Sequence, residues 1–400
     1  MNTLLLISFA TWVFSLLLIL LVLIVNPFMI WIKYLVKGKK PVRYSPDYRP
    51  SVSLVIVARN AENCVVKRLK NSLEIHFPSE DHEIVFFSDG STDNTLSLAK
   101  SIPSNKIRIF SSSEHLGKNN GLNQAIKECK GDILVLSDVD VMLDKDTILT
   151  LVKHFNDPEV GGVCGEKALL KVRMDMSTSQ TYHIRFEKTI KELESLTGSI
   201  SSNDGTLYAI RRNLFKPLPP GVTDDLYVCL SVVKQRSRFL YEPEAKAYIE
   251  PPSKSTRHEM VRRRRIVSNS LMGLYLMREL MNPFKYGTFA IILFINKVLR
   301  RVIPFCLILV FFSNLFLAFH STAMEVFLCL QIAFYSLAAS YKLFFRRHSR
   351  LKKITKIAAL VYYFCVGNCG TLLGVLWFLK GSNMTKWEPI SDGEYNRKIH

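Results

Sequence analysis

Two stretches of apolar sequence, one toward each end of the 400-residue chain, most constrain what it can fold into. Residues 4–25 are almost wholly apolar and exceed the roughly 20 residues that an α-helix needs to cross a bilayer. Apolar sequence returns after Pro283 and continues almost to residue 379. The residues between these stretches have the composition of an ordinary soluble domain. We therefore predict a soluble domain that is flanked in the sequence by membrane helices.

The first apolar stretch is expected to be a membrane anchor, in residues 1–32. A signal peptide would carry early positive charge and a small-residue cleavage site, and neither is present. The positive charge follows the stretch instead, at Lys33, Lys37, Lys39, Lys40 and Arg43. Because basic flanks mark the cytoplasmic side, we expect an integral protein of the plasma (inner) membrane with its soluble domain in the cytoplasm.

The second apolar stretch is expected to begin with a helix in the membrane interface, over residues 282–301. Lys297, Arg300 and Arg301 interrupt its apolar pattern, which suits a helix lying in the interface better than one crossing it. Three spanning helices are then expected within residues 302–380, followed by a tail at 381–400. Their predicted bounds are 303–319, 324–345 and 357–379.

The last predicted span leaves two interpretations open. Gly367, Asn368, Gly370 and Gly374 would let it pack closely against a neighbouring helix, or would break it. The side of the membrane on which the C-terminus emerges is therefore not predicted.

The formal net charge of +19 raises the question of nucleic-acid binding. That function needs basic residues on a soluble binding face. Here many of them flank the apolar stretches, including a second block at Arg346, Arg347, Arg350, Lys352 and Lys353. Positive charge beside membrane helices attracts anionic lipid. We expect membrane lipids as partners, and no nucleic acid.

The central part of the chain alternates short apolar runs with segments of helical spacing. The runs at 53–58, 83–87, 107–110 and 133–136 read as buried strands. Strands that alternate with helices predict an α/β fold with a mostly parallel central sheet and helices on both faces. Ligands of such sheets bind beyond the carboxyl ends of the strands.

Polar clusters follow the first two predicted strands. Ala58 to Glu62 read A-R-N-A-E, and Ser88 to Thr95 read S-D-G-S-T-D-N-T. A polar turn with a helix N-cap explains the residue types one by one. It does not explain an acid at the exit of each of two nearby strands, and Asp89 is a candidate to bind a uracil or ribose edge.

The fourth predicted strand ends in Ser137-Asp138-Val139-Asp140. Residues two apart in a strand point to the same side, so Asp138 and Asp140 can converge on one divalent cation. Mn²⁺ and Mg²⁺ both prefer oxygen ligands and bridge phosphates. A D-x-D sequence arises often by chance, but its place at the end of a buried strand favours a metal and diphosphate site.

These motifs, together with G-K-N-N-G-L-N at 117–123, resemble glycosyltransferase family 2. That family includes the membrane-embedded cellulose, hyaluronan and poly-N-acetylglucosamine synthases, and the resemblance covers residues 50–266. It implies a GT-A type nucleotide-sugar domain. It also implies a set of donor-site residues, with Asp138 and Asp140 at the metal: Ala58, Glu62, Asp89, Lys118, Asp138 and Asp140.

The resemblance extends to the acceptor and the base. Asp204 and Gly205 lie in a segment that resembles the one beneath the acceptor sugar in the family. Thr223-Asp224-Asp225 resembles the motif whose final Asp is the catalytic base. An acceptor hydroxyl is a poor nucleophile, and a positioned carboxylate that takes its proton supplies about 10²–10⁴-fold. A helix N-cap is the alternative for this triplet, and the two roles are compatible.

One motif departs from the family pattern. Polysaccharide synthases usually carry Q-x-x-R-W where this chain has Arg262 to Ile266, R-R-R-R-I. Arg262 and Arg265 are candidates to clamp the diphosphate, because guanidinium recognises phosphate well. A basic patch against lipid headgroups is the alternative. The missing Trp puts processive polymerisation in doubt.

The sequence thus predicts an inverting, metal-dependent transfer of a hexose or N-acetylhexosamine from a nucleotide sugar, with a UDP-sugar as the expected donor. The acceptor would be a growing polysaccharide or a lipid-linked sugar. Transfer of a single sugar to a lipid is the first alternative, and the missing Trp favours it. A non-catalytic sugar-nucleotide sensor is the second, and the presence of Asp138, Asp140 and Asp225 argues against it.

Overall fold

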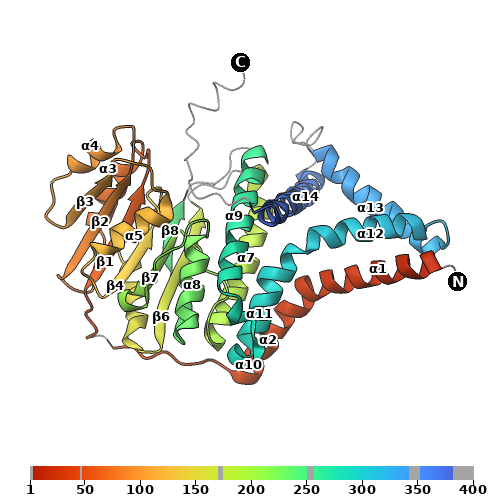
Figure 1. Ribbon diagram of the computed structural model, residues 1–400, viewed down its shortest axis with the longest axis horizontal. Coiled ribbons are helices and arrows are strands. Elements are labelled where there is room, and N and C mark those ends of the chain that lie inside the picture. Colours follow the sequence, from red (N-terminus) through yellow and green to blue (C-terminus); the bar gives the residue numbers. More distant parts are fainter. Residues whose placement is uncertain (1–2, 46, 170–173, 250–255, 342–351, 382–400) are drawn as a thin grey trace, which may run out of the picture. The chain divides into compact units, whose positions relative to one another are not determined.

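The computed structural model describes residues 3–45, 47–169, 174–249, 256–341 and 352–381. The chain divides into two compact units (Figure 1). Among the described residues, the helical unit comprises 3–38, 174–193, 256–341 and 352–381. The sheet unit comprises 39–45, 47–169 and 194–249.

Within the described residues, the sheet unit has one eight-stranded sheet in the order β3-β2-β1-β4-β7-β6-β8-β5. The strands are β1 (Val52–Ala58), β2 (His82–Asp89), β3 (Ile107–Ser112), β4 (Ile133–Ser137), β5 (Met142–Leu143), β6 (Val160–Leu169), β7 (Leu207–Arg211) and β8 (Arg238–Ile249). The predicted α/β fold is confirmed, and strands β1 to β4 form the expected parallel half. Beyond β4 the sheet is mixed, because β7 runs antiparallel to both β4 and β6.

The parallel half is buried on both faces. Six of the seven residues of β1 are buried, which explains why its sequence is continuously apolar rather than alternating. Helices of the sheet unit are α3 (Val65–Leu73), α4 (Thr95–Lys100), α5 (Lys118–Lys127), α6 (Thr147–Val152), η2 (Lys153–Asn156), η3 (Arg212–Leu214) and α8 (Asp224–Lys234). Helix α7 (Met174–Thr197) begins in the helical unit and ends in the sheet unit.

The helical unit contains the two apolar ends of the chain. Its elements are α1 (Thr3–Leu20), η1 (Leu21–Val25), α2 (Asn26–Lys37), α9 (Thr256–Leu276), η4 (Arg278–Met281), α10 (Pro283–Tyr286), α11 (Thr288–Leu293), η5 (Phe294–Val298), η6 (Leu299–Arg301), α12 (Ile303–Leu317), α13 (Thr322–Ser340) and α14 (Lys352–Leu379). Helices α1 and α12 lie side by side (Figure 1). Large apolar side chains such as Phe14 and Leu330 are more than half exposed, as expected of a lipid-facing surface.

Three helices in the described part of the chain are long and apolar enough to cross a bilayer. They are Thr3–Lys37, Thr322–Ser340 and Ile354–Leu379. The pair Thr288–Arg301 and Ile303–Leu317, bent by 53°, meets the same criterion only when it is counted as one span.

The N-terminal helix is longer than predicted and continues past Pro27 to Lys37. A proline lacks the backbone N–H that a helix interior needs, and a π-helical turn at Leu21–Val25 ends two residues before it. The stretch predicted as an interfacial helix is divided among α10, α11, η5 and η6. Its placement at a membrane interface stays a prediction, as do the domain boundaries. Most of the basic block at 346–353 and nearly all of the tail at 381–400 lie outside the described residues.

The glycines of the last apolar stretch serve close packing, since α14 is unbroken over Lys352–Leu379. A Cβ added at Gly370 would come 2.9 Å from Cβ of Arg263 on α9. One added at Gly374 would come 2.6 Å from Cβ of Val267, also on α9. Small residues at these positions therefore let the two helices approach each other closely.

Candidate active site

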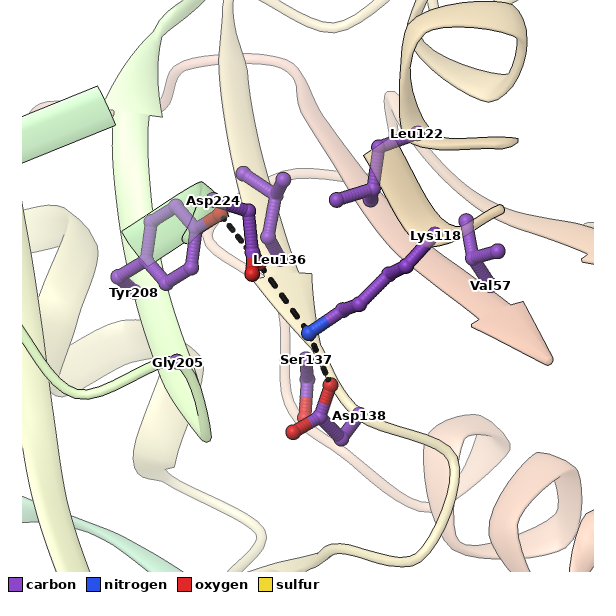
Figure 2. Close-up of a pocket in the computed structure, with 9 residues that line it drawn as sticks. All are labelled: Val57, Lys118, Leu122, Leu136, Ser137, Asp138, Gly205, Tyr208 and Asp224. Carbon is purple, nitrogen blue, oxygen red and sulfur yellow. Dashed lines mark hydrogen bonds and ion pairs between the residues drawn. The ribbon is translucent and has the colours of Figure 1, made fainter. Parts of the chain in front are cut away.

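A small pocket lies at the carboxyl end of β4 in the sheet unit (Figure 2). Strands β1, β4 and β7, helices α5 and α8 and the segment before β7 all contribute to it. Its lining residues are Val57, Lys118, Leu122, Leu136, Ser137, Asp138, Gly205, Tyr208 and Asp224. Its place agrees with the general rule that ligands of open α/β sheets bind beyond the strand ends.

Lys118 is the central cation of this pocket (Figure 2). It is the first residue of α5 and follows Gly117, whose φ of 87° favours glycine. Its Nζ lies 2.8 Å from Oδ1 of Asp138 and 3.2 Å from Oδ2 of Asp224. Burial by itself would lower the pKa of Lys118, but these two carboxylates raise it above its ordinary value. Lys118 therefore carries a positive charge that links the end of β4 to the start of α8.

Helix α8 begins with two acids. Thr223 occupies the N-cap position of α8, as the capping alternative predicted. Its side chain, however, makes no cap hydrogen bond among the described residues. Acids in the first turn are favoured by the helix dipole. Asp224 also accepts a hydrogen bond from the Tyr208 hydroxyl at 3.4 Å. The triplet thus contributes one carboxylate to the Lys118 ion pairs.

Asp225 lies beside the segment that was predicted to contact the acceptor. A Cβ added at Gly205 would come 3.5 Å from Oδ2 of Asp225, and Oδ1 of Asp225 accepts a hydrogen bond from Leu226 N at 2.7 Å. Burial and the neighbouring charge of Asp224 raise the pKa of Asp225 to about 6, although the Leu226 N–H opposes the rise. A carboxylate with this pKa is ionised at neutral pH and is a stronger base than an ordinary aspartate.

Asp138 and Asp140 are the residues predicted to hold a metal ion. Burial raises the pKa of Asp138, the nearby carboxylates of Asp140 and Asp224 add to the rise, and Lys118 opposes it. Asp138 is partly buried and Asp140 is exposed. Within the described residues, no cluster of three or more His, Cys, Asp or Glu side chains surrounds one point. Two carboxylates fit Mg²⁺ or Mn²⁺, which commonly take one or two protein carboxylates and complete their shell with phosphate and water oxygens.

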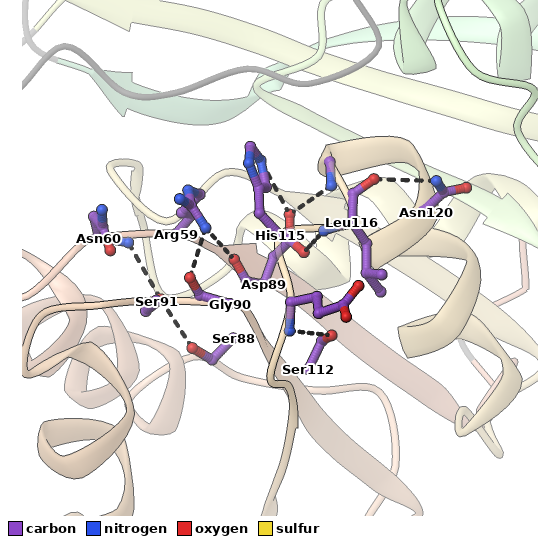
Figure 3. A network of polar contacts seen from close by, with 12 residues as sticks. Arg59, Asn60, Ser88, Asp89, Gly90, Ser91, Ser112, His115, Leu116 and Asn120 are labelled. Atoms are coloured by element: carbon purple, nitrogen blue, oxygen red, sulfur yellow. Dashed lines mark hydrogen bonds and ion pairs between the residues drawn. The ribbon is translucent and has the colours of Figure 1, made fainter.

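Asp89, predicted to bind the nucleotide, organises a loop (Figure 3). It is 2% exposed, and its carboxylate accepts hydrogen bonds from Leu116 N at 2.7 Å and Gly117 N at 3.0 Å. His115 Nε2 lies 3.7 Å from the same carboxylate. These contacts hold the loop from which α5 begins, so Asp89 helps to position Lys118.

The loops after β1 and β2 are tied together by hydrogen bonds. Arg59 Nη1 donates to the carbonyl oxygens of Asp89 at 3.2 Å and Gly90 at 2.5 Å (Figure 3). Glu62 Oε2 accepts from Asn94 N at 3.1 Å. The Ala58 side chain is buried in the core. Ala58 and Glu62 thus each have a structural role, and their contact with the nucleotide stays a prediction.

Arg262 and Arg265 lie on α9, in the helical unit. Arg262 pairs with Glu259 on the same helix, with Nη2 and Oε1 3.0 Å apart. Arg264 stacks on Trp377 of α14, with its Cζ 4.1 Å from the ring centroid. These contacts anchor part of the arginine run within its own unit. The proposed diphosphate clamp by Arg262 and Arg265 stays a prediction.

Three residues of this region were not predicted from the sequence. They are Tyr208, which donates to Asp224, His115, which faces Asp89, and Arg68, whose Nε donates to the backbone oxygen of Asp138 at 3.4 Å. Arg68 could have been found from the sequence. It stands three residues after Val65 and directly before Leu69, so helical spacing places it on the same side of α3 as these apolar residues. Tyr208 lies in the same segment as Asp204 and Gly205, which resembles the family's acceptor segment, but that resemblance gave it no role, and no signal marks His115.

Comparisons with known proteins bear on the family resemblance and on the fold. The family model described as glycosyl transferase family 2 matches residues 53–218, which confirms the resemblance drawn from the motifs. The chain is 25% identical over 228 residues to the poly-β-1,6-N-acetyl-D-glucosamine synthase of Staphylococcus aureus strain MSSA476, covering 53% of this chain and 55% of that protein. It is 27% identical over 199 residues to the β-monoglucosyldiacylglycerol synthase of Nostoc sp., covering 47% and 42% respectively. The chain thus spans about half the length of these relatives or less.

A solved structure supports the fold over most of the chain. It is the mannosyltransferase PcManGT from Pyrobaculum calidifontis, determined in complex with GDP-Man and Mn²⁺. The TM-score is 0.72 at 20% sequence identity, covering 93% of this chain and 100% of that one. At this identity the similarity confirms the GT-A type fold.

Proposed function

We propose that this chain, whose residues 53–218 match the glycosyl transferase family 2 model, transfers a hexose or N-acetylhexosamine from a nucleotide sugar to an acceptor, with inversion at the anomeric carbon. The observation that carries the proposal is the convergence of Lys118, Asp138 and Asp224 at the carboxyl end of β4, next to Asp225. This arrangement brings together a cation that could bind a diphosphate, carboxylates that could bind a metal ion, and a carboxylate that could act as the base.

Asp225 is the proposed base. As the acceptor hydroxyl attacks the anomeric carbon, its proton passes to the Asp225 carboxylate, and the bond between that carbon and the diphosphate oxygen breaks. Attack from the face opposite the leaving group inverts the configuration. A pKa of about 6 leaves Asp225 ionised above that pH, while keeping it basic enough to take the proton. Gly205 leaves room beside this carboxylate, because it has no side chain.

Lys118 is proposed to bind the departing diphosphate. Its ammonium group pairs with both Asp138 and Asp224, and a diphosphate would share it with them. Asp138 and Asp140 would hold a divalent metal ion, which would stabilise the negative charge on the diphosphate. The similarity to a mannosyltransferase that was solved with GDP-Man and Mn²⁺ supports a metal requirement.

The donor and the acceptor are proposed from the relatives. The Staphylococcus aureus relative is named for a polymer of N-acetylglucosamine, which supports an N-acetylhexosamine donor, with UDP as its expected carrier, and a polysaccharide acceptor. The Nostoc relative is named for a glucosylated diacylglycerol, which supports transfer of one sugar to a lipid as the alternative. The three apolar helices support action at a membrane, and we propose that the sheet unit faces the cytoplasm at the plasma membrane.

The test is incubation of purified protein in membranes with a panel of UDP- and GDP-sugars, with Mn²⁺ or Mg²⁺. We expect release of one nucleoside diphosphate, which identifies the donor. Sizing of the product separates a polymer from a glycolipid. Donor binding without turnover for every acceptor tried would favour a sugar-nucleotide sensor, and no binding of any nucleotide would refute the proposal.

A further inference from the structure

Helix α3 carries a charged residue on its buried face. Val65, Arg68, Leu69 and Ser72 are its buried residues, and their spacing places them on one side of the helix. Arg68 is 0% exposed and is among the largest fully buried side chains of the described chain. A buried guanidinium is costly unless something compensates its charge, so its surroundings call for an explanation.

The contacts of Arg68 lead to the turn that follows β4. Its Nη1 donates to Asn71 Oδ1 at 3.2 Å and to Ser72 Oγ at 3.0 Å. Its Nε donates to the backbone oxygen of Asp138 at 3.4 Å. Its Nη2 is buried and has no hydrogen-bond partner among the described residues. Arg68 therefore contacts the main chain of Asp138 and leaves the carboxylate of that residue to Lys118.

Asn71 holds the other end of the same turn. Its Nδ2 donates to the backbone oxygen of Leu143 at 2.9 Å, and its Oδ1 accepts from Leu143 N at 3.0 Å. Arg68 and Asn71 thus attach both ends of the segment 138–143 to α3. This segment contains Asp140, the second carboxylate of the proposed metal site.

The charge of Arg68 complements this segment. The guanidinium of Arg68 is a cation at neutral pH, because arginine is not deprotonated in proteins. Among the residues that line the described pocket, Lys118 is the one cation, and it already pairs with both Asp138 and Asp224.

We propose that Arg68 is a positioning residue of the donor site, which fixes the Asp138–Asp140 turn from beneath and supplies a buried positive charge that holds its carboxylates ready for a metal–diphosphate. This inference rests on the proposed function, because it assumes a nucleotide donor at this turn. Arg68 itself would touch neither the donor nor the metal.

The test compares two substitutions of Arg68 with a control on the same helix, in the full-length protein. Arg68→Met removes the charge at similar volume, and Arg68→Lys keeps a charge. Lys67→Met removes a charge from the exposed side of α3. Calorimetry measures the affinity for UDP and GDP with and without Mn²⁺, kinetics measure kcat and KM, and a thermal melt measures stability.

Arg68→Met should weaken the Mn²⁺-dependent binding of the nucleoside diphosphate by roughly 10- to 100-fold, as is usual when a group behind a metal ligand is lost. Arg68→Lys should recover most of this loss, and Lys67→Met should stay within about twofold of the wild type. Rescue by lysine at an unchanged melting temperature separates a role of the charge from a role in packing.

Wild-type affinity in Arg68→Met would overturn the inference. The inference would also be overturned if Arg68→Met and Arg68→Lys lost the same amount of nucleoside diphosphate affinity and the same amount of stability. If Arg68→Met does not fold, Arg68→Gln, which removes the charge but keeps hydrogen-bonding groups, decides instead, and unchanged Mn²⁺-dependent binding in that variant would overturn the inference. A wild-type protein that binds no nucleoside diphosphate would refute the proposed function rather than this inference alone.

Discussion

Replacing Asp225 with asparagine removes the basicity of this side chain while it keeps the size and the acceptor oxygen that bonds Leu226 N at 2.7 Å. If Asp225 takes the proton of the acceptor, turnover should fall by about 10²–10⁴-fold. Binding of the nucleotide should survive, because the proposed donor contacts come from Lys118, Asp138 and Asp140. The same substitution should also change stability, and the sign follows from the pKa.

Burial and Asp224 raise the folded-state pKa of Asp225 from 3.8 to about 6. The folded protein therefore binds this proton more tightly than the unfolded chain does. The ionised group destabilises the fold above pH 6, and this effect disappears as the pH falls below 3.8. A rise of this size corresponds to roughly 3 kcal/mol at about 1.4 kcal/mol per pKa unit. Since Asp224 shares the interaction, we expect Asp225→Asn to stabilise the protein by about 1–3 kcal/mol at pH 7.5.

The assay measures turnover, nucleotide affinity and the free energy of unfolding for Asp225→Asn beside the matched control Asp224→Asn. The control loses the 3.2 Å ion pair with Lys118, so it should be destabilised and bind the donor less well, with a milder loss of turnover. Near-native turnover in Asp225→Asn together with an inactive Asp224→Asn would assign the base to the other carboxylate. Equal loss of nucleotide affinity in both would make the pair structural, and Asp204 would be the next candidate for the base.

Further outcomes are expected. The rate of the wild type should fall as the pH drops through about 6, because Asp225 becomes protonated, and a flat pH–rate profile between 5 and 8 would contradict its assignment as base. Asp140→Ala and chelation of the wild type should each abolish transfer, so full activity in the presence of a chelator would exclude the metal. Lys118→Met should weaken binding of the nucleoside diphosphate at least roughly tenfold, measured by calorimetry, because the phosphates lose a buried cation. Cysteine probes placed in residues 79–112 should resist an impermeant reagent applied to intact cells, and efficient labelling would place the sheet unit outside.

Local sequence determined which segments of this protein form strands and helices, and which polar residues stand at the ends of those elements. Apolar runs identified β1, β2 and β4 as buried strands, and the acids at the ends of β2 and β4, Asp89 and Asp138, marked the edge of the sheet where the site lies. The long apolar stretches identified the helices that could cross a membrane. The strand predictions succeeded because the period of a strand and the residue types at its end are properties of neighbouring residues.

The meeting of residues 118, 138 and 224 was decided by the tertiary structure. Lys118 begins one helix, Asp138 ends a strand and Asp224 begins another helix, and no spacing in the sequence says that one ammonium group lies within 3.2 Å of both carboxylates. The sheet order brings β7 next to β4, and with it Tyr208 next to Asp224.

Tertiary contacts likewise show that the Asp89 carboxylate accepts two loop N–H groups and that Arg68 lies beneath the turn at Asp138. The physical reason is that a pKa, an ion pair or a buried charge depends on groups far apart in the sequence. Their distances are set by the packing of whole elements, while a local pattern specifies only the elements themselves.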